Sequence, residues 1–219
     1  MKLIAKSGGV AAISLIGDEV KPLNGYRVQT LIEAVAARYK FAKIPTVEET
    51  NASGAKFGGG SFASKNITIT ELGLFNDAIH VTTTDTADSE VVRLDLFEWL
   101  VKQFHFREPT TKPKRAYQSD LIVEFENPPG EAFNLFEPLM QFIQKEVASH
   151  NGDKREIEFS RLDLGSDPMV SGANAQFIVE RRAGVFWKSN RFFCKAYMPT
   201  AAHIKALGLM DKLLGKAKR

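Results

Sequence analysis

Residues 66–104 constrain the fold of this chain more than any other stretch. Ile67 and Ile69 alternate with threonines, which is the pattern of a half-buried β-strand. Residues 78–83 alternate in the same way after a short polar turn and predict the returning strand. Residues 87–104 then carry apolar side chains at helical spacing, among them Val92, Leu96, Trp99, Leu100 and Phe104. A face this broad predicts a helix buried against its neighbours, and therefore a strand–strand–helix unit at the centre of the fold.

The remaining apolar patterns predict further strands and helices along the chain. We expect strands at residues 10–16, 41–47, 56–63, 117–126, 157–164, 175–182 and 192–197. We expect helices at residues 26–39, 132–149 and 201–214, and a polar loop at residues 48–54. Because the strands are grouped between helices, the order favours an α+β protein with an antiparallel sheet and helices packed on one face. The order of a strand, a helix, a group of strands and a helix recurs, which favours two similar βα(βββ)α halves.

Residues 109–116 are the best candidate for an internal boundary. They contain Pro109, Pro113 and a run of basic residues, and they offer little apolar surface to bury. The sequence therefore predicts an N-terminal α+β half at residues 1–108 and a C-terminal α+β half at residues 117–219, joined by this connecting segment.

Composition places the chain among soluble globular proteins. Of its 219 residues, 44% are hydrophobic and 25% are charged, and the formal net charge is +3. No stretch approaches the about 20 consecutive apolar residues that a membrane-spanning helix needs. The single cysteine, Cys194, excludes an internal disulfide and favours a reducing compartment, and its apolar neighbours predict a buried, unreactive thiol. We therefore expect a cytoplasmic protein without membrane contact.

The residue types that carry catalysis are scattered in this sequence. Its 4 histidines have no histidine or cysteine partner at metal-ligand spacing, so we expect no bound metal and no cofactor. Asp120, Glu124 and Glu126 share one face of a predicted strand, and Asp163 lies on a later strand. Clustered carboxylates bind Mg²⁺ in nucleases, which keeps a metal-dependent nuclease as an alternative. Acidic residues on a strand are more often its solvated face.

The segment from Arg181 to Lys195 is the most suggestive functional feature of the sequence. It interleaves basic and aromatic residues on a predicted hairpin, an arrangement that can hold phosphates and stack bases. The candidate nucleic-acid-binding residues are Arg181, Arg182, Trp187, Lys188, Arg191 and Lys195. The alternative is a structural hairpin with its aromatic rings directed inward and its basic side chains outward.

The sequence favours a non-catalytic subunit that binds another macromolecule or oligomerises through protein–protein contacts. The helices predicted at residues 87–104 and 132–149 carry a surplus of apolar residues, which favours self-association or a protein partner. Nucleic-acid binding through the hairpin is the second hypothesis, and a metal-dependent nuclease is the third.

Overall fold

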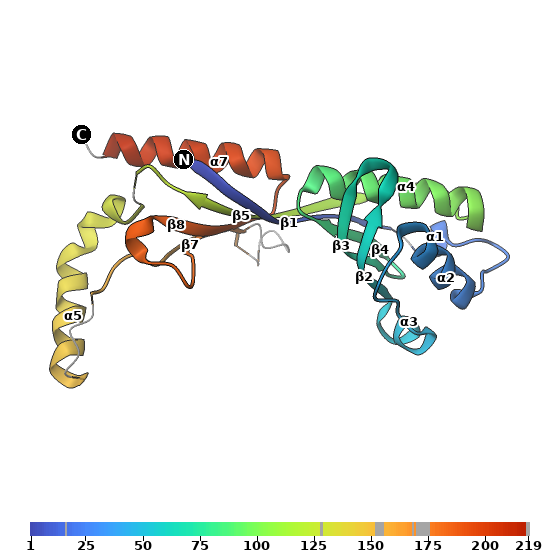
Figure 1. The fold of residues 1–219 in the computed structure, drawn as a ribbon, viewed down its shortest axis with the longest axis horizontal. Coiled ribbons are helices and arrows are strands. Elements are labelled where there is room, and N and C mark those ends of the chain that lie inside the picture. The colour runs from blue at the N-terminus through green and yellow to red at the C-terminus, as the bar shows by residue number, and fades with distance from the viewer. Residues whose placement is uncertain (16, 128, 152–155, 168, 170–175, 218–219) are drawn as a thin grey trace. The chain divides into compact units, whose positions relative to one another are not determined.

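The computed structural model describes residues 1–15, 17–127, 129–151, 156–167, 169 and 176–217 (Figure 1). Its strands are β1 (Lys2–Ser14), β2 (Ala55–Phe62), β3 (Ile67–Leu74), β4 (Ala78–Thr83), β5 (Lys114–Glu124), β6 (Arg161–Gly165), β7 (Gln176–Arg181) and β8 (Arg191–Ala196). Its α-helices are α1 (Gly17–Val20), α2 (Val28–Tyr39), α3 (Val47–Ser53), α4 (Thr86–Phe104), α5 (Glu137–Asn151) and α7 (Thr200–Ala217). Short 3₁₀ helices are η1 (Ala63–Lys65), η2 (Pro129–Phe136) and η3 (Trp187–Ser189).

The strands form a sheet in the order β2-β3-β4-β1-β5-β8-β7-β6. The pairs β1–β4, β2–β3, β3–β4, β6–β7 and β7–β8 are antiparallel. This arrangement confirms the predicted α+β fold built on an antiparallel sheet. The expected repetition is also present in the order of the elements, because β1, α2, β2–β4 and α4 are followed by β5, α5, β6–β8 and α7.

The chain divides into two compact units that interleave along the sequence. Unit 1 comprises Met1–Ala5, Leu121–Ala196 and Ala201–Arg219, and unit 2 comprises Lys6–Asp120 and Tyr197–Thr200. Strands β1 and β5 each contribute residues to both units. The boundary proposed from the sequence stays a prediction, and β5 begins inside the proposed connecting segment.

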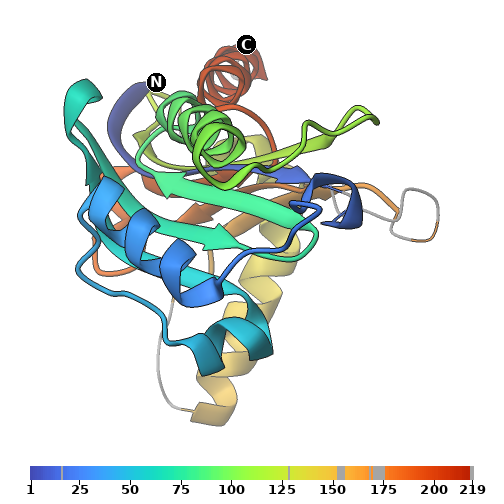
Figure 2. The same ribbon diagram turned by 90° about the vertical axis from the view of Figure 1, so that its right-hand side faces the viewer.

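In unit 2, α2 and α4 pack with the strands in one continuous apolar core (Figure 2). Ile79 and Val81 of β4 point into this core, and His80 between them faces away from it. The buried side chains of α2 are Leu31, Ile32, Val35, Ala36 and Tyr39. The contribution of α4 is Val92, Leu96 and Leu100. The predicted strand–strand–helix unit is therefore present, although Trp99 is half-buried at the border of the core.

Unit 1 has a core of its own, in which β5, β7 and β8 pack against α7. Fully buried side chains in this core are Leu121, Val123, Val179, Phe192 and Leu207. Cys194 is also fully buried, which confirms the predicted core thiol. Burial raises the pKa of this thiol, so the reactive thiolate is disfavoured.

Residues 41–54 differ from the predicted strand and loop. Lys43 makes an isolated bridge to Gly58 of β2, and the next element is the helix α3. The backbone N–H of Glu49 donates to the Thr46 hydroxyl (3.2 Å), and the Thr46 N–H donates to the Glu49 carboxylate (2.9 Å). This capping box satisfies free donors at the start of α3 and explains why the polar segment is helical.

Candidate interaction surfaces

Arg181, at the end of β7, is bound by other parts of unit 1. Its guanidinium carbon lies 5.2 Å from the ring centre of Trp187 and 4.9 Å from that of Phe192. Its Nη1 donates to the Trp187 carbonyl (2.6 Å), and its Nη2 donates to the Glu158 carboxylate (3.2 Å). Burial lowers the pKa of this guanidinium below its ordinary value. Through these contacts, Arg181 holds the segment that connects β7 and β8 against the end of β7.

Arg191 and Lys195 lie on the face of the sheet opposite to Arg181. Arg181 pairs in register with Phe192, which is buried, and Arg191 and Lys195 occupy the alternate positions of β8. The Nε of Arg191 donates to the Glu124 carboxylate of β5 (3.2 Å). The structure therefore does not gather these three basic residues into one patch.

Arg182, Trp187 and Lys188 lie at the connection between β7 and β8. Trp187 and Lys188 belong to η3 and are exposed, whereas Arg182 is half-buried. Glu156 and Glu158 line the same surface depression as Trp187 and Lys188. Carboxylates repel phosphate, so this depression combines the aromatic and basic groups expected of a nucleic-acid site with groups that oppose one.

Three of the carboxylates considered for a metal site are paired with basic groups, and Glu124, which accepts from Arg191, is one of them. Asp163 accepts a hydrogen bond from the Arg161 guanidinium (2.9 Å). Glu126 accepts one from the amino group of Met1 (2.6 Å). Within the described ranges, no group of three or more His, Cys, Asp or Glu side chains is arranged to hold a metal ion. Glu124, Glu126 and Asp163 act here as ion-pair partners.

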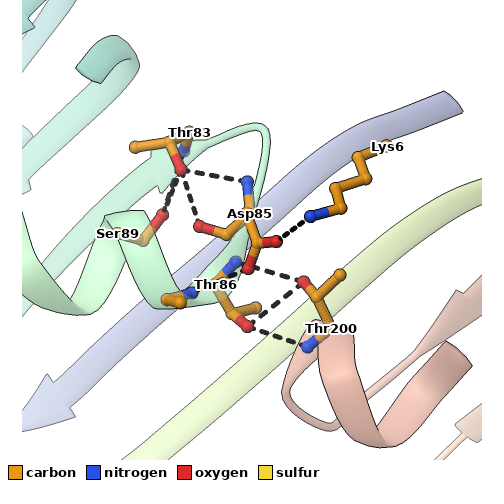
Figure 3. A network of polar contacts seen from close by, with 7 residues as sticks. Lys6, Thr83, Asp85, Thr86, Ser89 and Thr200 are labelled. Carbon is orange, nitrogen blue, oxygen red and sulfur yellow. Dashed lines mark hydrogen bonds and ion pairs between the residues drawn. The ribbon is translucent and has the colours of Figure 1, made fainter. Parts of the chain in front are cut away.

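The starts of α4 and α7 are joined by buried threonines (Figure 3). The Thr86 backbone N–H donates to the Thr200 hydroxyl (3.1 Å), and the Thr200 N–H donates to the Thr86 hydroxyl (2.8 Å). Each of these residues is the first of its helix, where backbone donors lack partners within the helix. The contact therefore gives an acceptor to one backbone N–H at the start of each helix. It also joins equivalent positions of the two βα(βββ)α repeats.

The same network ties α4 to β1. The Ser89 hydroxyl donates to the Gly9 carbonyl (2.6 Å) and accepts from the Thr83 N–H (3.0 Å). Asp85 pairs with Lys6, and although burial acts to raise the pKa of Asp85, its hydrogen bonds lower that pKa below the ordinary value. The polar groups of Figure 3 thus bind one another, and their arrangement anchors the helix.

α5 exposes a large apolar surface. None of its side chains that the structure describes is buried, and Leu139 and Phe142 are 53% and 61% exposed. Five exposed apolar side chains form what we call the α5 surface: Leu135, Phe136, Leu139, Phe142 and Ile143. Figure 1 shows α5 extending away from the strands of unit 1. Apolar side chains gathered in this way mark contacts with another macromolecule.

Stacked aromatic rings hold the base of α5. The ring of Phe133 in η2 lies 4.3 Å from that of Phe159, with an angle of 10° between their planes. The ring of Phe136 follows 6.5 Å from Phe133. The stack fixes where α5 departs from the strands of unit 1, and it leaves the α5 surface uncovered. The sequence predicted this helix, and its apolar surplus favoured a partner, but the spacing did not show which of its apolar residues would be exposed.

No family model and no curated protein matches this chain. In the part of the chain that the structure describes, no helix is long and apolar enough to cross a membrane. The surfaces of the two units are therefore the features that bear on function.

Proposed function

We propose that this chain is a subunit that assembles through protein–protein contacts at the α5 surface. The observation that supports this proposal is the exposure of five large apolar side chains along α5 and the end of η2. Removing apolar surface from water is favourable by about 25 cal/mol per Å². A helix that shows such a surface to solvent gains stability when a partner covers it.

The purified chain tests this proposal by its mass in static light scattering over a wide range of concentration. We expect a mass above the 24.3 kDa of a single chain, falling toward that value on dilution. A variant with Leu139→Glu and Phe142→Glu should stay monomeric, because charged groups cannot be buried without a partner. Its circular dichroism should match that of the unaltered chain, since both side chains are exposed.

A matched control replaces two exposed apolar residues of α4 by glutamate. Val91 and Leu94 are 38% and 44% exposed, so Val91→Glu and Leu94→Glu change the surface charge by the same amount. This control should assemble like the unaltered chain. The proposal is wrong if the unaltered chain is monomeric at every concentration.

Nucleic-acid binding through the hairpin predicts a different result. Exposed Trp187 and Lys188 are the residues that favour it. In that case single-stranded DNA would bind with strong dependence on salt, and Trp187→Ala with Lys188→Glu would weaken binding while leaving the mass unchanged.

A further inference from the structure

The sheet of unit 1 has an exposed apolar strip at the position that α2 covers in unit 2. In unit 2, Phe57 of the edge strand β2 is 1% exposed. In unit 1 the edge strand is β6, where Leu162 is half-buried and Leu164 is 54% exposed. Leu164 pairs in register with Phe177, whose ring centre lies 5.7 Å from that of His203 in α7. The strip therefore continues from the edge strand toward α7.

The contact between α2 and α4 shows what this position holds in unit 2. Asp95 of α4 accepts hydrogen bonds from the Tyr39 hydroxyl (2.6 Å) and from the Arg38 guanidinium (2.9 Å). The Arg38 guanidinium also lies 5.1 Å from the ring centre of Trp99. Asp95 and Trp99, one helical turn apart, therefore both contact the end of α2.

α7 carries leucines at the equivalent positions. Counted from the first residues of the helices, Thr86 and Thr200, Asp95 corresponds to Leu209 and Trp99 to Leu213. This register matches burial, since the buried side chains include Ser89, Arg93 and Leu100 in α4 and His203, Leu207 and Leu214 in α7. The two leucines are 59% and 55% exposed. The side of α7 that corresponds to the α2 contact is thus apolar and uncovered.

α5 has the apolar pattern of the helix that would fill this position. Leu31, Ile32, Val35 and Tyr39 of α2 have counterparts with the same spacing in α5, namely Leu139, Met140, Ile143 and Val147. All four residues of α2 are buried, and none of the four residues of α5 is. Spacing of this kind places side chains on one face of a helix, so α5 can cover a sheet and a neighbouring helix as α2 does.

Charge supports the same placement. Arg38 of α2, the partner of Asp95, has its counterpart in Glu146 of α5. On α7, Leu209 stands between the exposed residues Lys205 and Lys212. Leu209 itself cannot form an ion pair, but in this placement the acidic Glu146 of α5 would lie near the lysines that flank Leu209, so opposite charges would meet at the contact.

We propose that two copies of this chain exchange α5, so that α5 of each copy packs against α7 and β6 of the other. This inference rests on the proposed function, because it names what covers the α5 surface. The Phe133–Phe159 stack directs α5 away from its own strands, so a second copy provides the face that α5 lacks. The exchange forms the same contact twice and closes a dimer with twofold symmetry.

Disulfide trapping between different chains tests the exchange. The contact between Arg38 and Asp95 predicts that Glu146 of one copy lies beside Leu209 of the other. A chain with Glu146→Cys is mixed with a chain with Leu209→Cys and oxidised, and we expect a disulfide that joins the two chains. In the control, Leu94→Cys on α4 replaces Leu209→Cys at comparable exposure, and no such disulfide should form. Cys194 is buried and is present in every sample.

Three results would contradict the exchange, and they can be told apart. A disulfide that forms only within a doubly substituted chain, at concentrations where it is monomeric, would mean that α5 closes on its own unit. An absent disulfide, in a dimer that Leu139→Glu and Phe142→Glu still dissociate, would reject the exchange and leave the proposed function standing. A chain that is monomeric at all concentrations would reject both.

Discussion

α2 of unit 2 and α5 of unit 1 have the same spacing of apolar residues and opposite exposure. α2 lies against strands on one side and against α4 on the other, where Asp95 binds Arg38 and Tyr39. α5 follows η2, and its apolar side chains face solvent. The difference lies in what surrounds each helix. An amphipathic pattern therefore specifies which face of a helix will be covered, while the covering surface can belong to the same chain or to another.

Matched truncations of the two helices should show the largest difference. Ile32 of α2 is 2% exposed, so Ile32→Ala should lower the free energy of unfolding by about 2–5 kcal/mol through lost burial and a cavity. Ile143 of α5 is 38% exposed, so Ile143→Ala should change it by less than about 0.5 kcal/mol in dilute solution. Urea denaturation at several chain concentrations measures both. Equal losses in dilute solution would show that α5 is buried within its own chain.

The reciprocal threonine contact should give the next largest effect. Thr86→Val and Thr200→Val each leave one buried N–H without its acceptor, which costs about 1–3 kcal/mol. Because the contact is reciprocal, we expect similar losses for the two changes, and a double variant that loses less than their sum. Thr84→Val, at an exposed position of the same turn, is the control. Clearly unequal losses would mean that only one of the helix starts depends on the contact.

Acid should weaken unit 2 slightly through an ion pair that unit 1 lacks. The hydrogen bond from Arg93 holds the pKa of Glu90 below its ordinary value of 4.5, and the equivalent positions of α7 are Ile204 and Leu207. A carboxylate with a lowered pKa stabilises the folded state fully above that ordinary value. This contribution is lost as pH falls below it and through the pKa of the folded state.

The two tryptophans report this difference separately. Trp99 belongs to unit 2 and Trp187 to unit 1, so variants with Trp187→Phe or Trp99→Phe follow one unit each by fluorescence. We expect Glu90→Gln to reduce the loss of unfolding free energy that acid causes in unit 2, as reported by Trp99. The reduction should be less than about 1 kcal/mol. Glu98→Gln, at an exposed position of α4, should leave the acid sensitivity unchanged. An unchanged acid transition in the Glu90→Gln variant would show that the pair contributes nothing to stability.

Local patterns were sufficient to predict most of the fold. Strict alternation identified β4, and helical spacing identified α2 and α4, because each element buries one face. The missed helix α3 has a polar sequence, and the Thr46–Glu49 capping box was its available signal. Register and pairing partners depend on contacts between residues far apart in the chain, so the strand order β1-β5-β8 was not predictable from local patterns.

The candidate sites were harder to predict, because their properties depend on distant neighbours. The sequence placed Arg181 among basic residues that could meet a phosphate. Its partner Glu158 is 23 residues away, and only the fold brings the two together. Likewise, the spacing of Leu139 and Ile143 predicts an apolar face in the same way as that of Leu31 and Val35. Whether such a face is exposed depends on tertiary packing.

The interleaving of the two units has a consequence for the order in which they can form during translation. Met1–Ala5 are synthesised well before Leu121, yet they pack in a unit whose next segment begins only at that residue. Tyr197–Thr200, which complete unit 2, and α7, which covers the core of unit 1, are synthesised after all of these segments. Neither unit is whole before the ribosome passes residue 200. Until then the nascent chain presents unpaired strand edges, so its yield in cells should depend on chaperones that shield such edges.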